Sequence, residues 1–194
     1  MPDFNLDRFK KAQARDYAIA LSEIKNGRKQ SHWMWYIFPQ LKGLGFSSMA
    51  EFYGIDGLAE AKAYMADELL KGRLVEISEA LLSLPSSDAR EVMGYPDDLK
   101  LKSCMTLFMV AAPELEVFGK VLEKFFGGEK DLKTVEMVKR SKEPNLAMKF
   151  GEDMPDSRLT EPSDGKVFRL REAIFRSKKL GRPLTKEEME EFTL

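Results

Sequence analysis

Apolar residues recur at helical spacing along most of the chain. Between residues 6 and 24 they share one face opposite charged residues, and only Gln13 breaks the pattern. Asn5 stands where an N-cap is expected, and Gly27 where such a helix would end. Similar patterns, several of them opened by an aspartate N-cap (Asp67, Asp88 and Asp131), predict helices at about 48–53, 58–65, 68–84, 89–93, 97–111, 117–125 and 132–139.

The fold class predicted from this pattern is all-α. No Asn-Gly or Asp-Gly pair lies between two alternating runs, so no β-hairpin is indicated. We expect a compact multihelical domain over residues 1–140. Residues 141–165 are rich in proline and polar side chains and indicate a linker, while residues 166–178 and a capping box at 185–188 indicate helices. Residues 141–194 therefore form, on this prediction, a linker and a C-terminal helical extension.

Composition narrows the class of protein. The 194 residues include 31 Lys and Arg against 32 Asp and Glu, which argues against a general nucleic-acid coat. The lone Cys104 excludes an intrachain disulfide and suits a reducing cytoplasm. With one histidine and one cysteine we expect no metal site and no cofactor. No apolar run reaches the roughly 18 residues of a membrane span, and the N-terminus does not resemble a signal peptide.

The C-terminal extension has an uneven charge. Residues 166–182 carry seven Lys or Arg and one acid. Such a segment contacts an acidic partner or nucleic acid, or it forms an amphipathic helix that docks in cis or between copies of the chain. We favour docking, which includes a homo-oligomer through residues 166–194.

Residues 31–40 concentrate the unusual side chains. They contain the only histidine, His32, and both tryptophans, Trp33 and Trp35. We expect a short helix over residues 32–37, capped by Ser31 and stopped by Pro39, although a buried strand has the same apolar pattern. With Tyr36 these rings would suit stacking on a flat ligand, and Lys29 would face a phosphate or carboxylate. The alternative is that the aromatic side chains are core and His32 is a hydrogen-bonded core residue.

Residues 97–108 form the second candidate segment. On a helix, Leu101, Cys104, Met105 and Phe108 share one face. The neighbouring stripe of Lys102, Ser103 and Thr106 would bind an anion; alternatively, Lys102 is a solvated side chain. Asp97 and Asp98 suit the helix N-terminus as caps, and Asp98 is also a candidate acid or base. We disfavour a Ser103–Lys102 nucleophile because adjacent helical residues point about 100° apart, and a Cys104 nucleophile because free cysteines are mostly buried.

These motifs are similar to those of a known family. Residues 29–40 and 97–108 resemble the signature of the bacterial domain-of-unknown-function family 1810, sometimes labelled calpastatin, and residues 45–49, 53–55, 60–64 and 125–128 extend the match over about 4–140. The family usually has Ser at the position of Cys104. The resemblance implies a compact multihelical fold and no known reaction. A fainter resemblance is to the NAD- and ADP-ribose-associated (NADAR) superfamily, through a Ser/Tyr segment that precedes an Ala-rich helix.

Two functions follow as hypotheses. The first is a cytoplasmic protein that binds a nucleotide or an ADP-ribose-like molecule between the two segments, through Lys29, Ser31, Trp33, Trp35, Tyr36, Lys102, Ser103 and Thr106. If it is an enzyme, we expect hydrolysis or transfer at a glycosidic bond, with His32 or Asp98 as acid or base. The second is an interaction module without chemistry that uses the basic extension.

Overall fold

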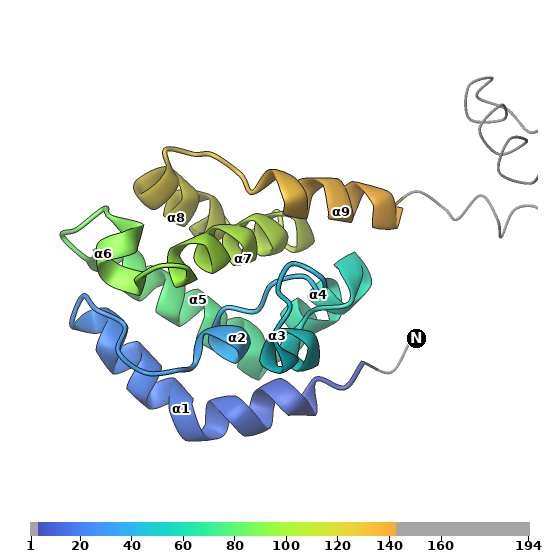
Figure 1. The fold of residues 1–194 in the computed structure, drawn as a ribbon, viewed down its shortest axis with the longest axis horizontal. Coiled ribbons are helices and arrows are strands. Elements are labelled where there is room, and N and C mark those ends of the chain that lie inside the picture. The colour runs from blue at the N-terminus through green and yellow to red at the C-terminus, as the bar shows by residue number, and fades with distance from the viewer. Residues whose placement is uncertain (1–3, 143–194) are drawn as a thin grey trace, which may run out of the picture. The chain divides into compact units, whose positions relative to one another are not determined.

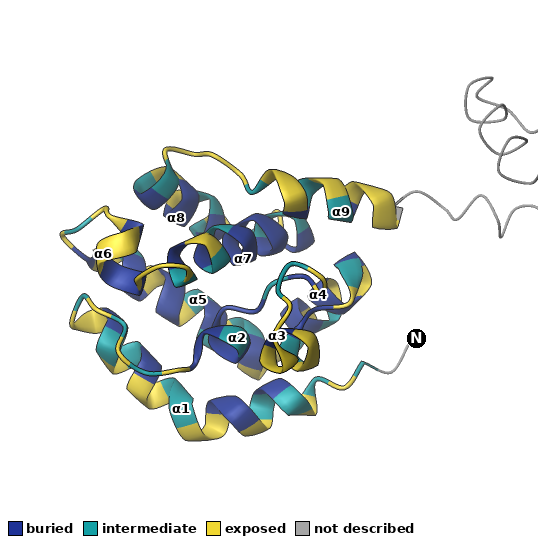
Figure 2. Cartoon of the chain, in the orientation of Figure 1, coloured by how far each residue is buried: buried dark blue, intermediate teal, exposed yellow. Residues whose placement is uncertain are grey.

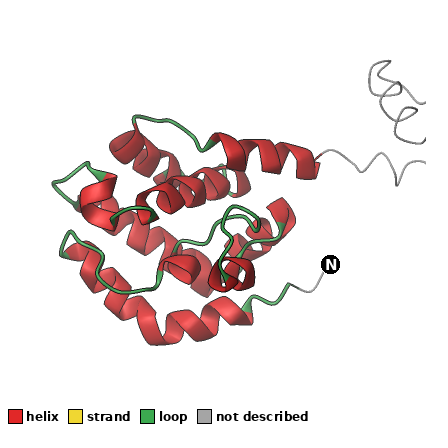
Figure 3. Cartoon of the chain, viewed as in Figure 1, coloured by secondary structure: helices red, strands yellow, loops and turns green. Residues whose placement is uncertain are grey.

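A computed structural model describes residues 4–142 of the protein. Over these residues the chain is helical with connecting loops and contains no strand (Figure 3), so the all-α prediction is confirmed. The helices are α1 (Asp7–Lys25), α2 (Met34–Ile37), α3 (Ser48–Tyr53), α4 (Gly57–Ala66), α5 (Glu68–Ser83), α6 (Ala89–Met93), α7 (Asp97–Ala111), α8 (Val117–Phe126) and α9 (Leu132–Lys142). The predicted extension, with its proposed oligomer contact, lies outside the described residues.

Helix α7 lies at the centre of this helical domain. It packs against α4, α6, α8 and α9, with α1 farther out on the opposite side from α9 (Figure 1). Its side chains are buried almost all round, as the dark blue of α7 shows (Figure 2). The predicted core face is confirmed, because Leu101, Cys104, Met105 and Phe108 are fully buried. Burial raises the pKa of the Cys104 thiol, which keeps it neutral and unreactive.

Short-range signals end and begin most helices as predicted. Gly27 ends α1 and has a left-handed backbone conformation, with φ at 82°. Its N–H donates to the Ile24 carbonyl at 2.8 Å, and the N–H of Arg28 donates to the Glu23 carbonyl. The carboxylate of Asp67 accepts the Leu70 N–H at 3.2 Å, and that of Asp131 accepts the Thr134 N–H at 2.8 Å.

The N-cap predicted at Asn5 is wrong. Leu6 occupies the cap position of α1 in a helical conformation, and no side chain caps the helix. Tertiary contacts outweigh the local preference here. Arg8 donates to the Asn5 carbonyl at 2.6 Å and to the Gly54 carbonyl at 3.0 Å, and its Nη1 lies 2.7 Å from the buried Glu60 carboxylate.

The capping box predicted at Asp88 is half formed. The Asp88 carboxylate accepts the N–H groups of Arg90 and Glu91 at 2.8 and 3.2 Å. The Glu91 carboxylate, which would reach back in a full box, instead accepts the Ser86 hydroxyl at 2.5 Å. The same Ser86 hydroxyl accepts the Asp88 N–H at 3.2 Å, so serine replaces the missing half.

A close backbone approach holds the loop after α2 against the end of α3. The N–H of Lys42 donates to the Ile55 carbonyl at 2.9 Å, and the N–H of Ile55 donates to the Gln40 carbonyl at 2.9 Å. A Cβ at Gly54 would lie 2.8 Å from both the Ala50 carbonyl oxygen and the Cα of Lys42, so only glycine fits. This contact fixes Gln40 beside α3. Within the described part of the chain, no helix is long and apolar enough to cross a membrane.

Candidate functional site

Glu23 of α1 organises the start of the signature segment, which we define as residues 31–40. Its carboxylate accepts the Ser31 hydroxyl, the N–H groups of Gln30 and Ser31 at 2.8 and 3.0 Å, and the indole N–H of Trp33 at 2.8 Å. The predicted helix is present but shorter, because α2 begins at Met34. The predicted Ser31 cap is wrong, because Trp33 occupies the cap position of α2 and no side chain caps this helix. The alternative of a buried strand is wrong as well.

This network holds the Glu23 carboxylate in its ionised form. Burial alone would raise the pKa, but the Ser31 hydroxyl, the two backbone N–H groups and the Trp33 indole favour the charged form more strongly. Together they lower the pKa from 4.5 to about 2. A depressed carboxyl pKa stabilises the fold above the unfolded-state value, and that contribution is lost as the pH falls from about 4.5 towards 2.

A Glu23→Gln variant is therefore expected to lose about 1–2 kcal/mol of unfolding free energy at pH 7. The variant replaces a charged hydrogen-bond acceptor with a neutral one, and hydrogen bonds to a neutral acceptor are weaker. The difference from the wild type should shrink as the pH falls from about 4.5 towards 2. Urea unfolding at several pH values measures it, with the exposed Glu79→Gln as control. A difference that stayed constant with pH would contradict the assignment.

Tyr36 and Gln13 fasten α2 to α1. The Tyr36 hydroxyl donates to Asp16 at 2.6 Å, and its backbone carbonyl accepts the Gln13 side-chain amide at 2.8 Å. Burial first, and the contact with the Asp16 carboxylate second, raise the pKa of Tyr36, so its hydroxyl stays protonated. Gln13 breaks the apolar pattern because its buried amide satisfies an α2 carbonyl. Trp33 and Tyr36 are thus buried packing residues.

The two segments singled out in the sequence touch through Asp97. Its carboxylate lies 2.9 Å from the Lys29 ammonium and 2.8 Å from that of Lys100. The Lys29 side chain is only 9% exposed. Burial alone would raise the pKa of Asp97. The hydrogen bonds and charges of Lys100 and Lys29 have the larger effect, so the pKa lies below its ordinary value. Two cations share one anion, and the outer one, Lys100, lies 4.9 Å above the Trp35 ring.

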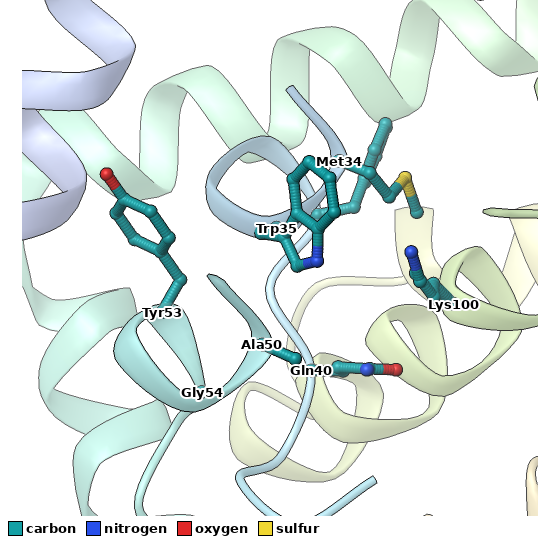
Figure 4. Close-up of a pocket in the computed structure, with 8 residues that line it drawn as sticks. Met34, Trp35, Gln40, Ala50, Tyr53, Gly54 and Lys100 are labelled. Carbon is teal, nitrogen blue, oxygen red and sulfur yellow. The ribbon is translucent and has the colours of Figure 1, made fainter. Parts of the chain in front are cut away.

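A small hollow adjoins this ion pair. Figure 4 shows Trp35, Gln40 and Lys100 around it, from α2, the following loop and α7. Its volume is about 10 Å³, which is room for one water molecule. The remaining lining comes from Met34, Phe38, Ala50, Tyr53 and Gly54.

A much larger open groove, of about 1040 Å³, begins where the hollow ends. Gln40 and Lys100 line both. The groove runs between the loop after α2, the first turns of α7 and the segment that leads into α9. Its charged lining residues are four lysines and two acids, an excess of two positive charges: Lys100, Lys102, Lys130, Lys133, Glu129 and Asp131. Neutral side chains complete it: Gln40, Leu44, Pro96, Leu99, Ser103 and Leu132.

Three predicted ligand-binding residues reach these cavities: Trp35 the hollow, and Lys102 and Ser103 the groove. Thr106 lies behind the groove wall and is fully buried. Its hydroxyl donates to the Lys102 carbonyl at 2.8 Å and accepts the Asp131 N–H at 2.9 Å.

The two candidate catalytic residues line neither cavity. His32 is exposed to solvent, and its carbonyl accepts the Tyr36 hydroxyl at 3.3 Å. Asp98 is buried and lies 3.4 Å from the Arg90 guanidinium, while its Oδ1 has no hydrogen-bond partner among the described residues. Across residues 4–142, no three His, Cys, Asp or Glu side chains gather as a metal site requires.

Sequence reasoning missed Gln40, Lys100 and the segment 128–133. Lys100 stands three residues after Asp97, a spacing typical of a helical ion pair, and this was the available signal. Nothing in the sequence shows that residues 128–133 return to α7.

Comparison with known proteins decides the family. The family model described as "Protein of unknown function (DUF1810)" matches residues 3–138, well over half of the chain. The chain belongs to this family. The crystal structure of the conserved hypothetical protein Rv1873 from Mycobacterium tuberculosis, at 1.38 Å, is similar: 44% identity over 70% of this chain and 97% of that chain, with a TM-score of 0.69. Curated proteins give no match. Neither finding supports the fainter NADAR resemblance.

Proposed function

We propose that this member of the DUF1810 family binds an anionic small molecule, a nucleotide or an ADP-ribose-like compound, in the groove beside α7. The observation that carries the proposal is the groove itself. Four lysines line it, and the ammonium of one of them, Lys100, lies 4.9 Å above the ring of the half-buried Trp35. Lysine ammonium groups are common phosphate ligands, and tryptophan faces suit the stacking of flat rings.

The charges favour an anion over a cation. Lys102 pairs with Glu129 and Lys100 with Asp97, but Asp97 is already shared with the buried Lys29. Asp97 therefore neutralises the Lys100 ammonium only in part, and Lys100 can still attract an anion in the groove. The hollow beneath Trp35 is too small for a ring as it stands. A ligand that stacks on Trp35 must draw Lys100 from the indole towards its phosphate.

Binding, rather than a reaction, is the function that the geometry favours. The proposed acid or base residues, His32 and Asp98, lie outside the groove and the hollow. We therefore do not extend the proposal to cleavage or transfer at a glycosidic bond.

A second candidate, an interaction module without a ligand, has one observation in its favour. Phe46, just before α3, is 99% exposed, and two exposed residues of α3, Met49 and Phe52, follow it at spacings of three residues. A group of exposed apolar side chains of this kind is typical of a contact surface. If no anionic ligand binds in a screen, the interaction module becomes the favoured function.

The binding proposal predicts a response to nucleotides that depends on the groove lysines. The full chain is screened by thermal shift and then by calorimetry against ADP-ribose, ADP, AMP and inorganic pyrophosphate. We expect Lys100→Met and Lys102→Met each to weaken binding about tenfold or more, because each removes a charge-assisted contact. Lys71→Met, which removes a lysine from an ion pair on α5, is the control. Unchanged affinity in both groove variants would contradict the proposal.

A further inference from the structure

Glu129 lies on a short loop, residues 127–131, that connects α8 to α9 and contacts α7. Its carboxylate lies 3.1 Å from the Lys102 ammonium. The two partners differ in exposure: the Lys102 side chain is 21% exposed and the Glu129 side chain 78%. An acidic group thus reaches in from solvent to a lysine of the groove, at the place where an anionic ligand would contact it.

Backbone hydrogen bonds hold this loop at both ends, whereas the Glu129 side chain is exposed. The N–H of Gly128 donates to the Leu122 carbonyl at 3.0 Å, and that of Glu129 donates to the Phe126 carbonyl at 3.0 Å. At the far end the Asp131 N–H donates to the buried Thr106 hydroxyl at 2.9 Å. Exposed side chains change rotamer within nanoseconds. Glu129 is therefore able to leave Lys102 without any rearrangement of the loop.

We propose that Glu129 is an internal competitor for the ligand's negative charge, which occupies Lys102 in the free protein and is displaced on binding. This inference rests on the proposed function, because it concerns regulation of the same groove. A displaced Glu129 remains near the bound anion and repels it.

The displacement is easy because the ion pair is exposed on one side. Surface ion pairs contribute little to stability, since water and salt screen them. Removing the Glu129 charge abolishes both the competition and the repulsion. We expect an affinity gain of about two- to fivefold for a polyanion, which corresponds to an exposed charge pair.

The experiment is calorimetric titration of the folded full chain with inorganic pyrophosphate. The variants are the wild type, Glu129→Gln, Lys102→Met and the double variant Glu129→Gln/Lys102→Met. Glu116→Gln is a matched control, because Glu116 is also 78% exposed, also pairs with a lysine, at 2.8 Å, and lies outside the groove lining. Titrations at low and at high salt separate a charge effect from a change in shape.

The expected result is tighter binding in Glu129→Gln at low salt, a smaller gain at high salt, and no gain in Glu116→Gln. The gain must also be smaller when Lys102 is absent, because the competition is then lost and only the repulsion by Glu129 remains. If the wild type binds pyrophosphate and Glu129→Gln binds it equally well, the competitor role is overturned and the binding function stands. If pyrophosphate binds to none of the variants and nucleotides do not bind either, the proposed function fails, and the competitor role fails with it.

Discussion

The Asp97→Asn variant is expected to lose about 3 kcal/mol of unfolding free energy at pH 7. Removing one partner of a buried ion pair leaves the other charge uncompensated, which typically costs 3–5 kcal/mol. Lys29 would be that charge, because it is buried and has Asp97 as its carboxylate partner. Its other contacts, the Ser31 carbonyl at 2.6 Å and the Trp33 ring at 5.1 Å, do not neutralise an ammonium. Urea unfolding of the variant and of the wild type measures the loss.

Acid should produce the same effect in the wild type. The pKa of Asp97 in the folded protein lies below its ordinary value of 3.8, so the stabilisation is complete above that value. It is lost as the pH falls through the lower folded-state pKa. Asp97→Asn should therefore be less sensitive to acid than the wild type over this range.

A double variant separates charge from geometry. Lys29→Met with Asp97→Leu removes both charges and keeps apolar volume, and exchanges of this kind often restore stability. We expect it to recover most of the loss in Asp97→Asn. Glu116→Gln, which breaks an exposed ion pair with Lys120, should leave stability unchanged. A double variant no more stable than Asp97→Asn would show that packing around Asp97, rather than an unpaired Lys29, decides the effect.

Helix positions could be predicted from the sequence because they follow local rules. The cap at Asp67 and the stop at Gly27 depend on residues within one turn, and both are as predicted. The two wrong caps share one feature: the helix begins later than predicted. Leu6 occupies the cap position of α1 and Trp33 that of α2, so Asn5 and Ser31 precede the cap positions. Asn5 and Ser31 instead take part in hydrogen bonds with Arg8 and Glu23.

The candidate site could be predicted only in part. The segment with the aromatic residues and the segment of α7 do meet, at Trp35 and Lys100, and Lys29 just before the first segment pairs with Asp97. Their meeting does not make a single pocket of all the predicted residues, because Trp33, Tyr36 and Thr106 are buried and line neither cavity. The opposite wall of the groove comes from residues 128–133, and the contact between Glu129 and Lys102 spans 27 positions of sequence. The helical spacing of apolar residues does not predict which distant segments come into contact.

The two tryptophans illustrate what the sequence leaves open. They are two positions apart, so they point to nearly opposite sides of a helix, about 200° apart. The sequence offers core packing and ligand stacking for both. The structure separates them: Trp33 is 1% exposed and donates to Glu23, whereas Trp35 lies at the edge of the hollow under Lys100.

Trp33→Ala is accordingly expected to destabilise the fold by about 4 kcal/mol, since deleting a buried tryptophan side chain leaves a large cavity. It also removes one of the hydrogen bonds that hold Glu23. Trp35→Ala, at a half-buried position, should cost about 1 kcal/mol, within the range of ordinary substitutions. Thermal and urea unfolding of the two variants measure the contrast. In ligand titrations the order should reverse, with Trp35→Ala losing affinity for ring-bearing nucleotides but not for pyrophosphate.

Trp33→Phe provides a milder test if the alanine variant does not fold. It keeps most of the ring volume that packs 6.1 Å from Phe38 between ring centres, and it loses the indole N–H that donates to Glu23. We expect a loss of about 1–2 kcal/mol, as for a hydrogen bond to a charged acceptor. Equal losses in Trp33→Ala and Trp35→Ala would mean that both rings serve the core equally. Trp35 would then no longer be a candidate for stacking, and the groove lysines alone would have to account for any binding of nucleotides.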